Sequence, residues 1–267
     1  MSAERNNIEC TAVFLDVRNF TDTLTKCSES QGFYDLIERV YHEGLSISSK
    51  LSFNGDCYIN STGDGFLCIF FNDYHYIKGF VFSLLIHLTL PKYFNNYFML
   101  EKKVCDYWFG VGIESGIVKE VISEYTTKQI KTYIGEVINK AARLESLTKE
   151  HARAPIVFGP LLNEYLSKYI TGISYSQLVE QAKDELDSKN AEQLHEQMAS
   201  INSMLLSSYL FEHRIKGLKD NLPVFRVSPS LVDINKTHFW KLIEKLPIVI
   251  KNVIEEILRS NNYEWKL

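Results

Sequence analysis

The sequence predicts an α+β fold, on the strength of three observations. Short apolar runs typical of strands alternate with longer runs of helical spacing. Two aromatic-rich runs, residues 57–61 and 66–70, flank the turn Thr62-Gly63-Asp64-Gly65, as in a β-hairpin. The order along the chain is strand, helix, strand, strand, helix, strand. This is the order of the split βαβ, or ferredoxin-like, arrangement.

The first half of the chain shows these elements in turn. Residues 11–15 (TAVFL) are typical of a buried strand, and residues 21–48 have helical spacing. Asn72 or Asp73 is expected to cap the next helix, which ends before Pro91. Its most apolar part, residues 80–90, is too short to span a bilayer, so we expect a buried helix.

The second half continues the alternation. Residues 107–113 (YWFGVGI) predict a strand that turns at Ser115-Gly116. The run EVINKAARLESLTK after Gly135 has helical spacing, and residues 156–158 and 224–227 predict late strands.

Two segments extend this pattern. Residues 175–206 are polar and free of Gly and Pro, which predicts one long helix or a helical hairpin. Residues 238–259 are amphipathic, with a break expected at Pro247. We therefore expect a catalytic domain over 1–230 with a helical insertion, and a C-terminal helical extension over 231–267.

Composition narrows the functional classes. The 267 residues have an ordinary globular balance, and a net charge of -4 gives no electrostatic footprint for nucleic acid. The five cysteines are odd in number and lack a CxxC pair, which favours core residues in a reducing compartment. No apolar signal segment opens the sequence. We expect a cytoplasmic globular protein without a membrane partner.

Two aspartates follow strands that meet in a ferredoxin-like sheet. Asp16 ends the first strand and Asp64 lies in the hairpin turn. Neighbouring carboxylates repel each other, and a divalent cation such as Mg²⁺ or Mn²⁺ relieves that repulsion. Taken singly, Asp16 is better explained as a helix N-cap and Asp64 as a turn former.

Three further polar residues have the chemistry to bind a nucleotide. Asn139 and Arg143 lie four apart on one face of a predicted helix, where an amide can bind ribose and a guanidinium can stabilise phosphate charge. The alternative is a surface asparagine with Arg143 paired to Glu145. Lys219, in the KGLK loop, can reach phosphates, and the alternative is a solvated basic loop.

Five segments in order resemble the class III adenylate and guanylate cyclase catalytic domain: FLDVRNFT, NSTGDGF, GVGIESG, YIGEVINKAARLES and RIKGLKDNLPVFRV. The resemblance covers residues 11–227. It implies that Asp16, Asp64 and the carbonyl of Val17 bind two divalent metal ions, Mg²⁺ or Mn²⁺. It also implies roles in catalysis for Asn139, Arg143 and Lys219. The backbone of Asn19, Phe20 and Thr21 matches the phosphate-binding turn at a helix N-terminus.

The resemblance implies a homodimer as well. In this family the metal ligands come from one subunit and the transition-state residues from the other, so a chain with both sets forms two shared sites. Residues 123–131 correspond to the family's dimer-contacting arm. The ribose 3'-hydroxyl attacks the α-phosphorus of a nucleoside triphosphate, and pyrophosphate leaves.

The base pocket departs from the family pattern. Adenylate cyclases have Lys, and guanylate cyclases Glu, at the position of Asn60, and the second selector is Thr132. Asn19 and Ile138 also differ from the usual residues, without removing a ligand. The aromatic ring of Tyr58 lies two positions before Asn60.

These departures resemble the stand-alone pyrimidine cyclases of the bacterial Pycsar antiphage systems, which implies an enzyme making cUMP or cCMP as a signal in antiviral defence. An adenylate cyclase making cAMP is the alternative within the same class. An inactive cyclase-fold binding module is the alternative of another class, and pyrophosphate release distinguishes it.

Overall fold

The first four strands form the ferredoxin-like core that the element order predicts. β1 (Asn7–Val17) lies between β3 (Gly65–Phe71) and β4 (Phe109–Tyr125), and β2 (Cys57–Ser61) pairs with β3 at the edge. All three pairings are antiparallel. The computed structural model describes residues 7–18, 20, 31–53, 55–94, 109–125, 128–149, 154–184, 207–213, 221–227, 233–235 and 237–263.

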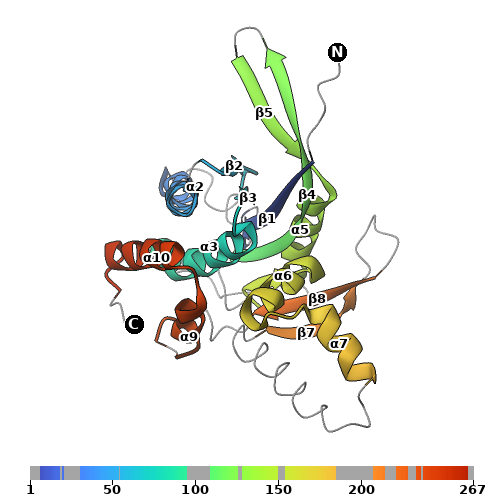
Figure 1. Ribbon diagram of the computed structural model, residues 1–267. Helices are drawn as coiled ribbons and strands as arrows, with labels where there is room; N and C mark the ends of the chain where they lie inside the picture. The colour runs from blue at the N-terminus through green and yellow to red at the C-terminus, as the bar shows by residue number, and fades with distance from the viewer. Residues whose placement is uncertain are drawn as a thin grey trace.

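Three more strands extend the sheet beyond β4. β6 (Ile156–Phe158) runs parallel to β4, and β8 (Leu222–Val227) and β7 (Ser207–His213) follow in antiparallel pairings, giving the order β2-β3-β1-β4-β6-β8-β7. The two predicted late strands are confirmed as β6 and β8. The mixed α+β fold is therefore as expected (Figure 1).

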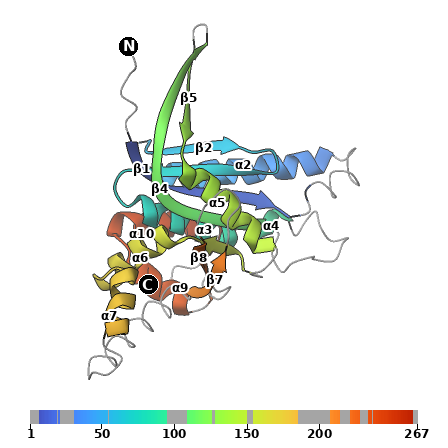
Figure 2. The same ribbon diagram turned by 90° about the vertical axis from the view of Figure 1, so that its right-hand side faces the viewer.

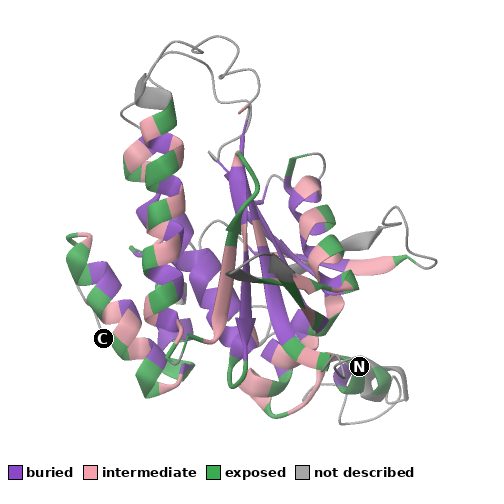
Figure 3. Cartoon of the chain, turned by 90° about the horizontal axis from the view of Figure 1, so that it is seen from above, coloured by how far each residue is buried: buried purple, intermediate pink, exposed green. Residues whose placement is uncertain are grey.

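Helices on one face of the sheet enclose the main core. α2 (Gln31–Leu51) and α3 (His75–Thr89) approach the sheet closely. Gly44 of α2 leaves room for the ring of Phe66 in β3, and Gly79 of α3 leaves room for Thr11 in β1. The predicted buried helix is confirmed, since nearly every residue of α3 is buried. The short α4 (Pro91–Phe94) follows it, and α6 (Pro160–Thr171) adds Leu162 and Leu166 to the same core. Figure 3 shows the buried residues gathered along the strands in the middle of the molecule, with exposed residues on the outer sides of the surrounding helices.

The start of α3 differs from the sequence prediction. Neither Asn72 nor Asp73 is the N-cap, which is Tyr74 with a left-handed backbone and no side-chain cap. The chain leaves β3 through Asn72 and Tyr74, both at φ 60°, and the backbone carbonyl of Asn72 accepts from the N–H of His75 at 3.2 Å. A backbone hydrogen bond within the turn thus satisfies the first N–H of α3 in place of a capping side chain.

Helix α5 (Glu136–Leu147) packs against the opposite face of β1 and β4 (Figure 2). Glycines of β4 allow this contact. A Cβ atom on Gly112 would lie 2.1 Å from the carbonyl oxygen of Ala141, and one on Gly116 would lie 3.0 Å from Cβ of Val137. Gly112 and Gly116 of β4, called the glycine floor below, therefore let α5 pack directly on the sheet.

The predicted turn at Ser115-Gly116 is wrong. β4 continues through both residues to Tyr125 and pairs there with β5 (Lys128–Ile134), making a long two-stranded arm that projects from the body (Figure 1). Gly116 is needed for the approach of Val137 and not for a turn, while the Ser115 hydroxyl hydrogen-bonds Thr11 within the sheet at 2.8 Å.

The C-terminal helices pack onto the main core. α9 (Thr237–Lys245) and α10 (Ile248–Ser260) are separated at Pro247, so the expected break is confirmed. Ile250 and Ile254 join the core, and the Tyr263 hydroxyl donates to the carbonyl of Leu88 at 2.8 Å.

Two sequence predictions fall partly outside the described residues. The insertion begins with helix α7 (Tyr175–Asp184), and residues 185–206 are not described. The predicted first helix is observed from Gln31 and continues past Ser48 to Leu51, while residues 21–30 are not described. No helix among the described residues has the length and apolar character needed to cross a membrane.

Candidate active site

The two aspartates come together where β1 ends and the β2–β3 hairpin turns. Asp16 pairs in register with Gly65, and the backbone N–H of Val17 donates to the carbonyl oxygen of Asp64 at 3.1 Å. A Cβ atom on Gly65 would lie 1.9 Å from the carbonyl oxygen of Leu15, so only glycine permits this close crossing. The sheet thereby places both carboxylates at one point.

The electrostatics of this pair suit a divalent cation. Asp16 is 9% exposed, and burial together with the Asp16 carboxylate raises the pKa of Asp64. Hard carboxylate oxygens are the ligands that Mg²⁺ and Mn²⁺ prefer. Among the residues described, no group of three or more His, Cys, Asp or Glu side chains could hold a metal ion. One or two carboxylates are the usual protein contribution to a Mg²⁺ site, in which water and substrate oxygens supply the other ligands, so the chemistry of the two aspartates fits such an ion.

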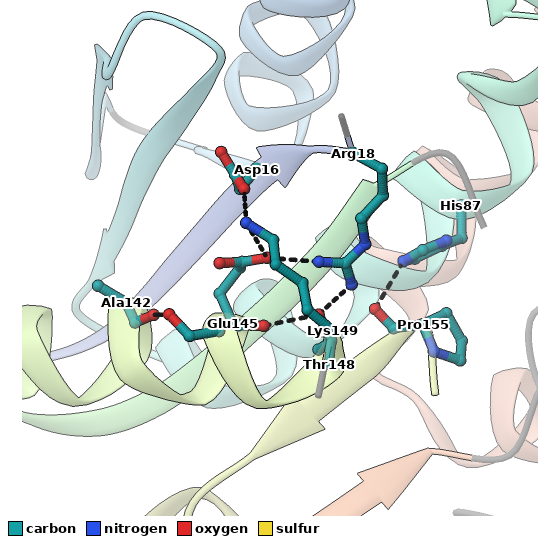
Figure 4. Close-up of polar contacts among 9 residues, drawn as sticks. Asp16, Arg18, His87, Ala142, Glu145, Thr148, Lys149 and Pro155 are labelled. Atoms are coloured by element: carbon teal, nitrogen blue, oxygen red, sulfur yellow. Dashed lines mark hydrogen bonds and ion pairs between the residues drawn. The ribbon is translucent and has the colours of Figure 1, made fainter. Parts of the chain in front are cut away.

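A lysine pairs with the first aspartate. Lys149, directly after α5, donates from Nζ to Oδ2 of Asp16, and the same Nζ lies 3.7 Å from Oε1 of Glu145 (Figure 4). Arg18 holds Glu145 from the other side, with Nη1 3.1 Å from Oε1, and also donates to the Thr148 hydroxyl. The site therefore contains its own cations beside the carboxylates.

Glu145 lies within this network and is nearly inaccessible to solvent. It is 3% exposed, and burial, followed by the negative charge of Asp16, raises its pKa to about 7 although Lys149 and Arg18 act in the opposite direction. The suggested pair of Arg143 with Glu145 is wrong, because Glu145 faces Arg18 and Lys149 instead.

Asn139 and Arg143 lie on the solvent side of α5. Both are exposed, whereas Val137, Ala141 and Leu144 of the same helix are buried. Within the described part of the chain, neither residue makes a hydrogen bond or ion pair with Asp16 or Asp64. Both side chains are therefore accessible from solvent.

The candidate base-pocket residues lie on two different elements. Asn60 is exposed on β2, and Thr132 is half-buried on β5 opposite Val121 of β4. Tyr58 contacts Tyr133 edge-on, with ring centroids 5.1 Å apart. Since side chains alternate along a strand, Tyr133 and not Thr132 faces Tyr58 within one chain.

The remaining predicted residues lie mostly outside the described residues. Asn19, Thr21 and Lys219 are not described, and Phe20 is half-buried. Sequence reasoning missed the group around Asp16, namely Arg18, Glu145, Thr148 and Lys149. The spacing of Glu145 and Lys149 on one helical face was the available signal, but it does not reveal which carboxylate they meet.

Residues 2–153 match the family described as the adenylate and guanylate cyclase catalytic domain, which is more than half of the chain. No curated protein matches the chain significantly.

Several solved structures share the fold. The adenylyl cyclase CyaB from P. aeruginosa aligns with a TM-score of 0.58 and 17% identity, over 85% of this chain and 96% of that one. A bacterial light-regulated adenylyl cyclase aligns with a TM-score of 0.57 and 18% identity, over 95% of this chain and 60% of that one. The guanylate cyclase domain of RhGC from Catenaria anguillulae, in complex with GTP, aligns with a TM-score of 0.52 and 16% identity, over 84% of this chain and 98% of that one.

Proposed function

This chain belongs to the family of adenylate and guanylate cyclase catalytic domains and is a nucleotidyl cyclase, and we propose that its substrate is a pyrimidine nucleoside triphosphate. The reaction forms cUMP from UTP, or cCMP from CTP, and releases pyrophosphate. The resemblance to stand-alone pyrimidine cyclases supports a role for that product as a signal in antiviral defence.

The observation that carries this proposal is Asn60. It is exposed on β2, on the same side of the strand as Tyr58, at the position where purine cyclases have a charged residue. An amide both donates and accepts a hydrogen bond, which matches the N3–H and O4 of uracil or the N3 and N4–H of cytosine. The Tyr58–Tyr133 contact fills space next to this position and favours a small base.

Asp16 and Asp64, with the carbonyl of Val17, would hold the divalent ions that the family's reaction requires. When bound, these ions, Mg²⁺ or Mn²⁺, activate the ribose 3'-hydroxyl and neutralise the triphosphate. Asn139 orients the ribose, and Arg143 stabilises charge on the phosphoryl group as the bond to pyrophosphate breaks. Lys219 is proposed to bind the leaving pyrophosphate as a point charge.

The active site is proposed to form between two copies of the chain. Asn139 and Arg143 are exposed to solvent and, among the described residues, make no hydrogen bond or ion pair with Asp16 or Asp64. The proposed reaction therefore takes each set of residues from a different subunit. The β4–β5 arm exposes three isoleucines, Ile122, Ile130 and Ile134, each 49–62% exposed, and Ile117 at its base is 52% exposed. Exposed apolar side chains gathered on one element are typical of a protein–protein contact.

Product identification tests the proposal. Purified protein with Mn²⁺ and an equimolar mixture of the four ribonucleoside triphosphates should form cUMP or cCMP as the main product, and Asp16→Ala should form none. Turnover of ATP at least as fast as that of UTP and CTP would show instead an adenylate cyclase.

A further inference from the structure

We propose that Lys149 is the resident counter-ion of the metal site: it neutralises Asp16 in the metal-free protein and gives up that contact when a divalent ion binds. The inference rests on the proposed metal role of Asp16. It assigns to Lys149 a positioning role, in which it sets how tightly the site binds metal before substrate arrives.

The contact geometry supports this role. Nζ of Lys149 donates to Oδ2 of Asp16, one of the two oxygens that a metal ion would use. The Lys149 side chain is 43% exposed, whereas that of Asp16 is 12% exposed, so the lysine reaches the carboxylate from the open side. An ion approaching Asp16 from solvent therefore meets the ammonium group first.

The charges around the site require such a cation. Nζ of Lys149 contacts the carboxylate of Asp16 and lies 3.7 Å from that of Glu145, and Asp64 stands at the adjoining hairpin turn, where its carbonyl oxygen accepts from the N–H of Val17. The contacts of Arg18 in this network are with Glu145 and with the Thr148 hydroxyl. In the described part of the chain, Lys149 is the cation that contacts Asp16 itself.

Glu145 provides a place for the displaced lysine. Its Oε1 lies 3.7 Å from Nζ of Lys149, one helical turn back on the same side of the helix. Arg18 fixes the Glu145 carboxylate at 3.1 Å, so this second acceptor stays in position when Asp16 changes partner. Lys149 can thus move from Asp16 to Glu145 by a change of side-chain rotamer.

Manganese binding without nucleotide tests the role of Lys149. Titration of the protein with Mn²⁺, followed by the electron paramagnetic resonance signal of the free ion, should give Lys149→Met an affinity about three- to tenfold higher than wild type. In the metal-free state Lys149→Met should melt at a lower temperature, and Mn²⁺ should raise its Tm more than that of wild type. Unchanged or weaker Mn²⁺ binding in Lys149→Met would overturn the inference.

Three controls separate the causes. Lys140→Met removes a lysine of the same helix that pairs with Glu136 at 3.1 Å, and it should bind Mn²⁺ as wild type does. Lys149→Arg keeps the charge and should also behave as wild type. An increase in Mn²⁺ affinity in either variant equal to that in Lys149→Met would contradict the counter-ion role. Asp16→Ala should lose Mn²⁺ binding; if it does not, the metal site itself is wrong, irrespective of Lys149.

Discussion

Asp64 lies beside a carboxylate of the same charge, and burial adds to the cost of ionising it. A site of this kind is arranged for a charge that arrives with the substrate, at some cost to the stability of the empty protein. Lys149 offsets part of that cost at Asp16, but it makes no ion pair with Asp64 among the described residues. The two aspartates are therefore unequal in the metal-free state.

Replacing Asp64 should separate stability from catalysis. Asp64→Asn removes the like-charge repulsion, so we expect the metal-free protein to gain about 1 kcal/mol in urea unfolding at neutral pH. Cyclase activity should fall by at least about a hundredfold, because the proposed metal site loses one of its two carboxylates. Asp73→Asn, at an exposed position after β3, should change neither quantity. A stability loss in Asp64→Asn would contradict this account of the pair.

Asn60 should control the choice of base. Asn60→Lys places a donor for adenine N1 where the amide stands, so we expect the ratio of kcat/KM for ATP over UTP to rise about tenfold or more. Ser61→Lys adds the same charge at the next residue, which faces the other side of β2, and should leave the ratio unchanged. Equal effects of the two variants would show that charge alone shifts the preference.

At the scale of elements, the position of α5 depends on the glycine floor of β4. The sequence indicates the helix and the strand from local patterns, and both are observed. It does not indicate why Gly116 is a glycine, since the reason is a contact with Val137 of another element. The same limit explains the missed pair of Lys149 and Asp16, whose positions differ by 133 residues.

Alanine substitutions in the floor should show a graded effect. Gly112→Ala puts Cβ 2.1 Å from a backbone oxygen of α5, so the helix must shift, and we expect a loss of about 1–3 kcal/mol with reduced activity. Gly116→Ala meets only the Val137 side chain at 3.0 Å and should cost less. Urea unfolding measures both, and an equal loss in the two variants would contradict the direct packing of α5 on Gly112.

A second element, α6, begins at a buried carboxyl group. Glu114 accepts from the N–H groups of Ser115 at 2.9 Å and Leu162 at 3.1 Å, and burial raises its pKa from 4.5 to about 7. A carboxyl group with a raised folded pKa stabilises the fold fully below the unfolded pKa, and this contribution is lost as pH rises through the folded pKa. Glu114 therefore favours the native state more at pH 4.5 than at pH 7.5.

The pH dependence of stability should change in Glu114→Gln. The amide keeps an acceptor for both N–H groups but does not titrate. Between pH 5 and pH 8 the free energy of unfolding of Glu114→Gln should therefore fall less than that of wild type, by up to about 3 kcal/mol. Urea unfolding at several pH values measures this difference. Glu136→Gln, at an exposed position of α5, should follow wild type, and a Glu114→Gln profile parallel to wild type would contradict the assignment.

At the scale of the whole molecule, the fold follows the predicted element order, while the assembly of the site remains a prediction. The paired aspartates could be foreseen because a hairpin turn and the end of the first strand meet in any sheet of this topology. The length of the arm could not be foreseen. Gly116 resembles a turn residue as long as its contact with α5 is unknown, although β4 continues through it.

Mixing two inactive variants tests the shared site. Asp16→Ala and Arg143→Ala should each be inactive alone, but a mixed dimer has one complete site, so an equimolar mixture should recover up to about a quarter of wild-type activity. Asp16→Ala mixed with Asp64→Asn should recover none, because both lesions lie in the same half of the site. Activity from the first mixture equal to that of the second would contradict a site shared between subunits.

β4 is one uninterrupted strand of 17 residues, from the floor beneath α5 to the tip of the arm. Such a strand is about 55 Å long, and its inner part is held by β1 on one side. A force applied at the arm is therefore conveyed through continuous backbone to the residues that support Asn139 and Arg143. A contact on the arm is thus a contact on the same strand on which α5, the helix of Asn139 and Arg143, is packed.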